Sequence, residues 1–251
     1  MHISTTSAVI TGGASGLGEA TARHFAAKGA KVTLLDRDAE RGAQVAKDIG
    51  GHFVETDVTD ETSVEAAIAQ AQDQMGGLNA AVNCAGIALG IKTTGRDGPH
   101  PLSAFQKTID INLVGSFNIA RLAAAAMAKN EPEADGARGV IVNTASIAAF
   151  DGQKGQVAYA ASKGGIVGMT LPMARDLAQS GIRVMAIAPG IFATPMLKGL
   201  PQEVQDSLAA EVTNPARLGD PNEYARMVEF IVEMGYLNGE VIRLDGALRM
   251  R

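Results

Sequence analysis

The chain has 251 residues, 46% of them hydrophobic and 20% charged, and a formal net charge of −5. This length suits one domain with a large core, and the negative charge argues against nucleic acid or an anionic membrane surface as a general partner. The sequence contains no signal peptide and no apolar run near the ~20 residues needed to cross a bilayer, so we expect a cytoplasmic protein without a membrane partner.

The first predicted element is a short apolar strand at residues 8–10, which leads through a glycine-rich turn at 11–18 into a helix at 19–28. Glycines in such a turn let the backbone approach a pyrophosphate closely, and free amides at the start of the helix meet the phosphate charge. Strand, turn and helix together predict a dinucleotide site. The predicted cofactor contacts in the turn are Gly12, Ser15, Gly16, Leu17 and Gly18.

The second predicted strand, residues 31–35, ends on Asp36, eighteen residues after Gly18. A carboxylate at this place accepts hydrogen bonds from the adenosine ribose hydroxyls and repels a 2′-phosphate, which favours NAD over NADP. Arg37 argues the other way, because a base just after this strand can bind that phosphate, although it can equally be a solvated charge. Because Ser15 stands in the glycine turn where a basic residue could bind that phosphate, we predict NAD as the cofactor.

Two segments are predicted to shape a substrate pocket. Residues 89–103 connect a strand to a helix and exceed the common length of ~2–6 residues, and long loops in compact domains tend to be functional. Residues 195–217 follow a Pro-Gly turn, carry an apolar helix-like run and could close over a ligand. Both lie within a single domain that spans residues 1–251.

Three further strands are predicted at residues 139–143, 182–188 and 240–244, each short, apolar and bounded by turn residues. Strands alternate with helical patterns along the whole chain. This alternation predicts a single-domain α/β fold of Rossmann type, with a doubly wound parallel sheet of about seven strands and helices on both faces. Ligands bind such sheets at the carboxyl ends of the strands.

Ser146, Tyr159 and Lys163 form the predicted proton-transfer site. Tyr159 and Lys163 are four residues apart in a helical segment, so they leave the same helix face, and an ammonium near a phenol favours the phenolate and lowers its pKa from ~10. Ser146 could bind a substrate oxygen from the other side. Taken alone, such a pair could lie by chance on a solvated helix face. The predicted dinucleotide site at the start of the chain favours the functional interpretation. Gln156, one turn before Tyr159, either touches substrate or is an ordinary polar helix-start residue.

The single cysteine, Cys84, cannot form an internal disulfide and lies in an apolar strand, so we interpret it as buried filler and not as a nucleophile. The four histidines lack metal-ligand spacing. We therefore predict no metal.

Several separate motifs resemble those of the short-chain dehydrogenase/reductase family over nearly the whole chain. The resemblance implies a cofactor turn at Thr11, Gly16 and Gly18, an adenine contact at Asp57 and Val58, a strand end at Asn83, Ala85 and Gly86 in which Cys84 replaces a second Asn, a nicotinamide loop at Pro189, Gly190, Ile191 and Thr194, and a catalytic set of Asn112, Ser146, Tyr159 and Lys163.

The family's chemistry implies a role for each catalytic residue. Tyr159 would be the acid/base, Lys163 would lower the pKa of the phenol and bind the nicotinamide ribose, and Ser146 would hold the substrate oxygen. Asn112 would bend its helix and hold a water that relays the proton, or would bond only to backbone. The family also implies a homotetramer.

Segments 83–88, 143–150, 164–172, 216–221 and 237–246 resemble members of the family that act on 3-hydroxyacyl-CoA. This implies NAD-linked oxidation of a secondary alcohol at C3 of a short or branched acyl-CoA, and the reverse reduction. Lys92, Arg96 and Lys198 are then candidate contacts for the CoA phosphates, or else solvated charges.

Three alternatives stay open at this point. The first is a dehydrogenase of hydroxysteroids or other secondary alcohols that uses the same residues. The second, an NADPH-dependent 3-oxoacyl carrier-protein reductase, conflicts with Asp36. The third, an NAD-binding scaffold or sensor, would not need the complete set of Ser146, Tyr159 and Lys163.

Overall fold

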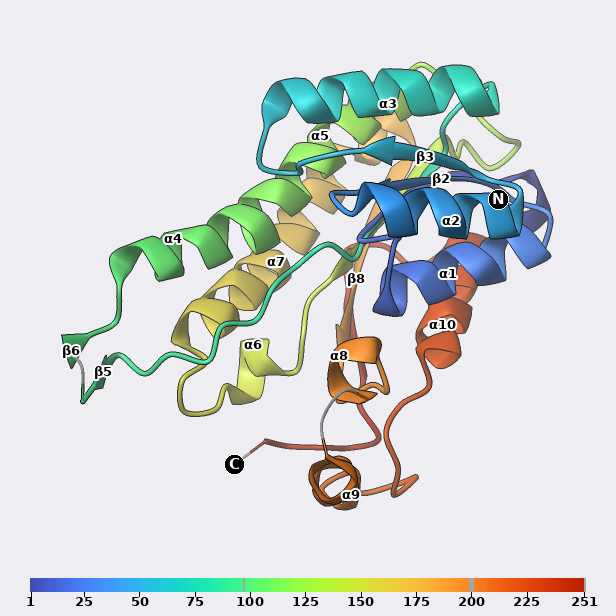
Figure 1. Ribbon diagram of the computed structural model, residues 1–251. Helices are drawn as coiled ribbons and strands as arrows, with labels where there is room; N and C mark the ends of the chain where they lie inside the picture. Colours follow the sequence, from blue (N-terminus) through green and yellow to red (C-terminus); the bar gives the residue numbers. More distant parts are fainter. Residues whose placement is uncertain (97, 199–200, 251) are drawn as a thin grey trace.

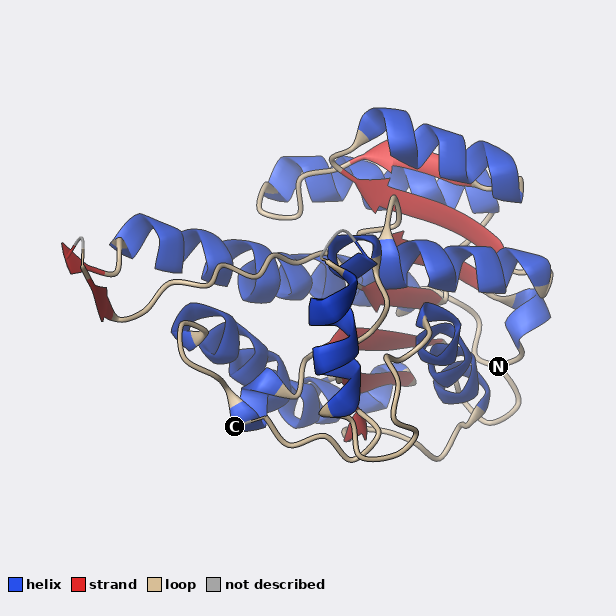
Figure 2. Ribbon diagram, turned by 60° about the horizontal axis from the view of Figure 1, so that its bottom comes forward, coloured by secondary structure: helices blue, strands red, loops and turns tan. Residues whose placement is uncertain are grey.

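The computed structural model describes residues 1–96, 98–198 and 201–250. Its centre is a seven-stranded sheet in the order β3-β2-β1-β4-β7-β8-β9, in which every neighbouring pair is parallel (Figures 1 and 2). The strands are β1 Ser7–Thr11, β2 Lys31–Asp36, β3 His52–Glu55, β4 Ala80–Asn83, β7 Gly139–Thr144, β8 Ile182–Pro189 and β9 Val241–Leu244. The strand order reverses at β1 and β4, as predicted for a doubly wound sheet.

Helices cover both faces of the sheet, and each face has its own buried core. One face carries α1 Gly16–Ala27, α2 Ala39–Ile49 and α10 Pro221–Glu233, and the other carries α3 Glu61–Met75, α5 Gly115–Met127 and α7 Val157–Asp176. Because parallel strands are buried on both faces, they read as continuous apolar runs, and every residue of β7 and β8 is buried. Within the described ranges, no helix has both the length and the apolar character that a membrane span requires.

Most of the remaining elements lie around the carboxyl edge of the sheet or extend from it, whereas two 3₁₀ turns, at residues 3–5 and 178–180, precede β1 and β8 at its amino edge. Together these elements are η1 Ile3–Thr5, α4 Leu102–Ile109, the π-helical turn η2 Asp110–Val114, α6 Ala148–Asp151, η3 Ala178–Ser180, α8 Pro195–Lys198 and α9 Gln202–Ala210. A small antiparallel hairpin joins β5 Thr94–Gly95 to β6 Gly98–Pro99.

The long connection predicted at 89–103 is therefore partly ordered into secondary structure. It contains the hairpin, and its last two residues already belong to α4, which begins at Leu102. Figures 1 and 2 show the hairpin at the outer end of α4, away from the sheet. The segment 195–217 contains α8 and α9, which lie near the carboxyl edge of the sheet (Figure 1).

Arg183 anchors the end of α10 to the sheet from a buried position on β8. Its guanidinium donates to the carbonyl oxygens of Ile231 (2.8 Å), Val232 (2.8 Å) and Leu237 (2.9 Å). These carbonyls lie in or just beyond the last turn of α10, where the helix has no backbone donors left to satisfy them. The guanidinium therefore serves as the C-terminal cap of this helix.

We predict that Arg183→Met lowers the free energy of unfolding by about 3 kcal/mol, because three buried carbonyl groups lose their donors together. Urea unfolding at one fixed protein concentration measures the change. The matched control is Arg23→Met, which removes a surface arginine that is 42% exposed and also binds two carboxylates; its expected cost is below about 1 kcal/mol. Equal losses in the two variants would contradict the capping role.

Candidate active site

A cleft of about 390 Å³ lies along the carboxyl ends of the central strands and brings most of the predicted cofactor contacts together. The predicted residues that line it are Gly12, Ser15, Gly16, Leu17, Gly18, Asp36, Asp57, Val58, Ala85, Gly86 and Thr194. They come from the ends of β1, β2, β3 and β4 and from the segment before α8. A cleft of this size at the point where the strand order reverses is typical of a nucleotide site.

The glycine turn is built by backbone packed against backbone. A Cβ on Gly12, whose φ is +64°, would lie 2.9 Å from the amide nitrogen of Ala85, and a Cβ on Gly18 would lie 2.2 Å from the carbonyl oxygen of Gly12. The hydroxyl of Thr11 accepts from the amides of Cys84 and Ala85, both at 3.0 Å. No side chain fits at these two glycines, so the turn can pack tightly against the end of β4 and against the start of α1 only with glycine there.

Asp36 closes the cleft at the end of β2. Its carboxylate accepts hydrogen bonds from the amides of Ala14 (3.0 Å) and Asp38 (3.1 Å). Arg37 points across the rim, with its Nε 3.7 Å from a carboxylate oxygen of Asp57. The base that could have bound a 2′-phosphate is therefore paired with a carboxylate in this structure.

Ser146, Tyr159 and Lys163 meet as predicted, although they come from two elements. Ser146 follows β7, while Tyr159 and Lys163 lie one turn apart on α7. The side chains of Ser146 and Tyr159 are hydrogen-bonded. The Nζ of Lys163 donates to the carbonyl oxygen of Thr144 at 2.6 Å and lies 5.8 Å from the centre of the Tyr159 ring. A hydroxyl, a phenol and an ammonium thus surround one point where a substrate oxygen can exchange a proton.

The predicted lowering of the Tyr159 pKa is wrong in this structure. Burial raises the pKa of the phenol above its ordinary value, and the hydrogen bond with Ser146 offsets this only in part. Burial also lowers the pKa of Lys163 from 10.5 to about 8. The spacing in the sequence predicted an ammonium near the phenol, but it could not predict how deeply both side chains are buried. Burial has the larger effect on both pKa values here.

Asn112 lies in the π-helical turn between α4 and α5, with its side chain fully buried. Its Oδ1 accepts from the amide of Ile87 (2.8 Å), and its Nδ2 donates to the carbonyl of Ile87 (2.9 Å) and to Ser162 Oγ (3.0 Å). The irregular turn agrees with the predicted helix bend. Two of these bonds go to the backbone and one goes to a side chain, so Asn112 does not bond only to backbone, and the relay water stays a prediction.

Some predicted contacts lie outside the cleft. Asn83 is buried and donates to Asn143 Oδ1 at 2.8 Å and to the carbonyl of Ser116 at 3.2 Å. Pro189 ends β8 and Gly190 follows it, while Ile191 lines a separate cavity of about 110 Å³. Gln156 precedes α7, where its Oε1 accepts from the amide of Gln153 at 2.9 Å.

The three basic residues considered for CoA phosphates are not gathered at the cleft. Lys92 and Arg96 are exposed on the connection that carries the hairpin. The side chain of Lys198 lies outside the part of the chain that the structure describes. Within that part, no group of three or more His, Cys, Asp or Glu side chains is placed to hold a metal ion.

The sequence prediction missed several residues of the site. Leu35, Thr56, Cys84, Ile87, Ile111 and Pro195 also line the cleft, and most of them directly neighbour a predicted contact. The sequence also gave no indication of Tyr224 on α10, whose hydroxyl lies 2.7 Å from the Oγ1 of Thr144, the residue whose carbonyl accepts from Lys163. Burial raises the pKa of the Cys84 thiol, in agreement with its interpretation as filler.

Comparison with known proteins was made on this geometry. A family model described as short chain dehydrogenase matches residues 6–205, a range that contains the glycine turn, Asp36 and the Ser146, Tyr159 and Lys163 set. The 3-hydroxyacyl-CoA dehydrogenase type-2 of Rattus norvegicus is 56% identical over 248 residues, which cover 97% of this chain and 95% of the relative. The enzyme of that name from Drosophila melanogaster is 55% identical over 246 residues, 96% of each chain.

The fold is also similar to a solved structure. The crystal structure of 3-hydroxyacyl-CoA dehydrogenase type-2 from Mycobacterium avium is 46% identical, covers 98% of this chain and 96% of its own, and superposes with a TM-score of 0.93. The resemblance expected from the motifs is thereby confirmed.

Proposed function

The chain belongs to the short-chain dehydrogenase family, and on that premise we propose that it transfers a hydride between NAD and C3 of a short or branched 3-hydroxyacyl-CoA. The observation that carries the proposal is the meeting of Ser146, Tyr159 and Lys163 beside the nucleotide cleft. The likeness to relatives named for this substrate extends over nearly the whole chain.

The residues of the cleft fit a nicotinamide dinucleotide. The backbone of Gly12, Gly16 and Gly18 lines the cleft where a pyrophosphate can approach the start of α1, and the carboxylate of Asp36 is placed for ribose hydroxyls. When bound, NAD supplies the carbon that accepts or returns the hydride. The protein supplies the orientation of both reactants and the path of the proton.

Tyr159 moves the proton at its phenolic oxygen. In oxidation the phenolate takes the proton of the alcohol, and in reduction the phenol returns it to the ketone oxygen. Ser146 donates to the same substrate oxygen and stabilises the charge that develops on it. Because burial raises the pKa of Tyr159, the phenol is protonated at neutral pH, which suits reduction, and oxidation should gain from higher pH. The Nζ of Lys163 lies 5.8 Å from the centre of the Tyr159 ring, within reach of the reacting end of the site.

Asp36 is proposed to decide between NAD and NADP. We expect Asp36→Asn to shift the ratio of kcat/KM values for the two cofactors towards NADP by about 10- to 100-fold, since removal of one charge beside a phosphate is worth a few kcal/mol at a partly desolvated site. An asparagine keeps one oxygen for the Ala14 amide. Asp38→Asn is the control, because it removes a neighbouring charge that only caps α2. An unchanged ratio in Asp36→Asn would refute the assignment.

The substrate is tested by steady-state oxidation of 3-hydroxybutyryl-CoA, its 2-methyl analogue and a 17β-hydroxysteroid, each with NAD and with NADP. The proposal expects an acyl-CoA with NAD to give the highest kcat/KM. Turnover of the steroid alone would keep the mechanism and overturn the substrate. No turnover of any of the three would favour another alcohol or a binding-only protein.

We also propose the homotetramer that the family resemblance implies. Large apolar side chains are exposed on two separate faces, and a soluble chain usually covers such side chains. The first group lies on α7 and at the start of α5 and consists of Val114, Phe117, Val157 and Leu171. The second group lies on and just after α10 and consists of Phe230, Met234 and Tyr236.

A further inference from the structure

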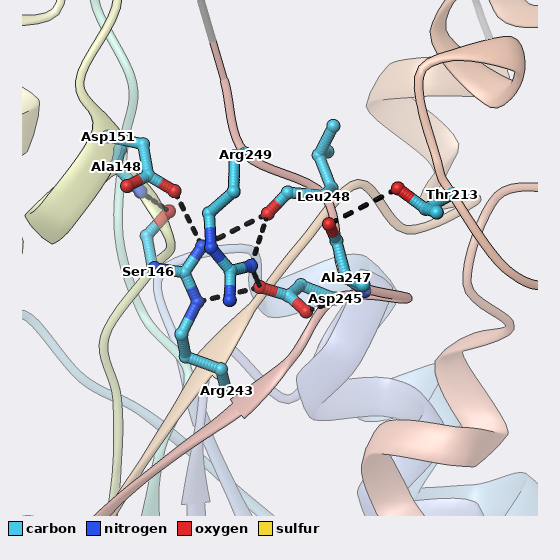
Figure 3. Close-up of polar contacts among 9 residues, drawn as sticks. All are labelled: Ser146, Ala148, Asp151, Thr213, Arg243, Asp245, Ala247, Leu248 and Arg249. Carbon is cyan, nitrogen blue, oxygen red and sulfur yellow. Dashed lines mark hydrogen bonds and ion pairs between the residues drawn. The ribbon is translucent and has the colours of Figure 1, made fainter.

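A cluster of charged side chains joins the end of the sheet to the turn that carries Ser146. It consists of Asp151, Arg243, Asp245 and Arg249, which we call the Arg243 cluster (Figure 3). The guanidinium of Arg243 binds Asp151 Oδ2 through Nη2 (2.5 Å) and Asp245 Oδ2 through Nε (2.7 Å), and Nη2 also donates to the carbonyl of Leu248 (3.1 Å). One side chain thus holds together two segments that are distant in sequence, the turn at 146–151 and the end of the chain after β9.

The first of these segments begins at Ser146. The Oγ of Ser146 accepts from the amide of Ala148 (3.1 Å), its carbonyl accepts from Ala149 (3.0 Å), and α6 then ends on Asp151. A helix of four residues has no stability of its own. Its position comes from the end of β7, from its packing against α7 and from the ion pair of Asp151 with Arg243.

The second segment is the turn after β9, which is hydrogen-bonded to the substrate-loop segment 195–217. Asp245 Oδ1 accepts from the amide of Ala247, whose φ is +63°. The carbonyl of Ala247 accepts from Thr213 Oγ1 (3.3 Å), and the carbonyl of Gly246 accepts from the amide of Asn214 (3.1 Å). Figure 3 shows Thr213 and Asp151 on opposite sides of Arg243.

Beneath these polar contacts, a small apolar cluster joins both segments to the substrate-loop segment. It is formed by the buried side chains of Ile147, Val212 and Leu248. Ile147 directly follows Ser146, Val212 lies at the end of the substrate-loop segment, and Leu248 supplies the carbonyl that Arg243 binds. Polar and apolar contacts therefore hold the segments in the same arrangement.

Burial separates the Arg243 cluster from ordinary surface ion pairs. The side chains of Arg243, Asp151 and Asp245 are only 22%, 18% and 7% exposed, whereas Arg249, which binds the same oxygen of Asp245, is 59% exposed. The guanidinium of Arg243 also lies 5.1 Å from the centre of the Phe150 ring in α6. Water screens the inner pairs much less than it screens Arg249.

We infer that Arg243 is a positioning residue for the proposed reaction: through Asp151 it fixes the turn that places the Ser146 hydroxyl, and through Asp245 it links that turn to the substrate-loop segment. The inference rests on the proposed function. Arg243 does not line the nucleotide cleft, so its loss should change the alignment of the substrate oxygen and not the affinity for the cofactor. Misplacement of a reacting group by ~1 Å can cost about 100-fold in rate.

The test compares Arg243→Met, Asp151→Asn, the double variant and Arg249→Met as the matched control. We expect kcat to fall about tenfold in each of the first two and by no more in the double variant, because both changes break the same contact. NADH affinity, measured by fluorescence, should stay at the wild-type value in all four, and Arg249→Met should keep the wild-type kcat. All assays are run below the onset of thermal unfolding, and Asp151→Asn alone tests the inference if Arg243→Met does not fold.

Hydrogen exchange provides a readout that needs no substrate. In Arg243→Met and Asp151→Asn, the amides of residues 148–151 should exchange about tenfold faster, while those of the glycine turn at 11–18 stay unchanged. Unchanged kcat, multiplicative losses in the double variant, or unchanged exchange at 148–151 would overturn the inference. Failure of the wild type to oxidise any of the alcohols would instead refute the proposed function, and the exchange data would still decide whether Arg243 fixes the turn.

Discussion

Tyr159→Phe is expected to reduce turnover by about 100-fold or more while the affinity for NAD remains close to that of the wild type, because only the proton-transferring oxygen is lost. The phenylalanine keeps the buried ring, and Ser146 loses its hydrogen-bond partner. Steady-state rates with 3-hydroxybutyryl-CoA measure the first effect, and quenching or enhancement of NADH fluorescence measures the second.

The control for this change is Tyr236→Phe, which removes the same atom from a tyrosine that lies just after α10 and does not line the cleft. It should leave both turnover and cofactor affinity unchanged. A Tyr159→Phe protein that retains more than a tenth of the wild-type turnover would contradict the acid/base role, and a parallel loss of NADH binding would indicate a damaged cleft.

Lys163→Met is expected to abolish turnover and to make the protein more stable at neutral pH. Lys163 is buried, none of the described carboxylates pairs with it, and burial lowers its pKa from 10.5 to about 8. The folded protein at pH 7 therefore holds a desolvated ammonium, whereas the unfolded chain holds a hydrated one. At ~1.4 kcal/mol for each pH unit, this difference costs the folded state on the order of 3 kcal/mol below pH 8.

The sign of the pH dependence follows from proton binding. Between about pH 8 and pH 10.5 the unfolded chain binds the proton of Lys163 more strongly than the folded protein does, so the free energy of unfolding rises with pH in this window. Methionine removes the charge but leaves the carbonyl of Thr144 without its donor, which costs ~1–2 kcal/mol. The net gain at pH 7 should therefore be about 1–2 kcal/mol.

Urea unfolding of both proteins from pH 7 to pH 10.5 measures this prediction. The advantage of Lys163→Met should shrink and then reverse as the pH rises, with a total change of about 3 kcal/mol. The raised pKa of Tyr159 acts above pH 10 and is common to both proteins. Loss of the exposed Lys107 in Lys107→Met should change stability by less than about 0.5 kcal/mol. Parallel stability curves for wild type and Lys163→Met would contradict the account.

Much of the fold could be predicted, because short stretches of sequence determine where its strands, turns and helices form. Apolar runs predicted strands at 8–10, 31–35 and 182–188, and the structure extends them only slightly, to Ser7–Thr11, Lys31–Asp36 and Ile182–Pro189. The spacing of Asp36 from the glycine turn predicted that it lies at the cofactor site, and in the structure it lines the cleft. Helical periodicity likewise placed Tyr159 and Lys163 on one helix face.

What could not be predicted depends on contacts between distant segments. The pairing of Arg243 with Asp151 spans 92 residues, and that of Tyr224 with Thr144 spans 80. Neither pair leaves a pattern in the sequence. The pKa of Tyr159 was predicted in the wrong direction for the same reason, since desolvation depends on everything that packs around the phenol.

The central claim is that this protein moves a hydride from C3 of an acyl-CoA alcohol to NAD, with Tyr159 taking the proton. The most direct test is oxidation of 3-hydroxybutyryl-CoA carrying deuterium at C3, followed by mass spectrometry of the reduced cofactor. The account predicts that each reduced cofactor gains one deuterium, and that Tyr159→Phe forms almost none of this product. Reduced cofactor without deuterium, or no reduced cofactor from the wild type, would contradict it.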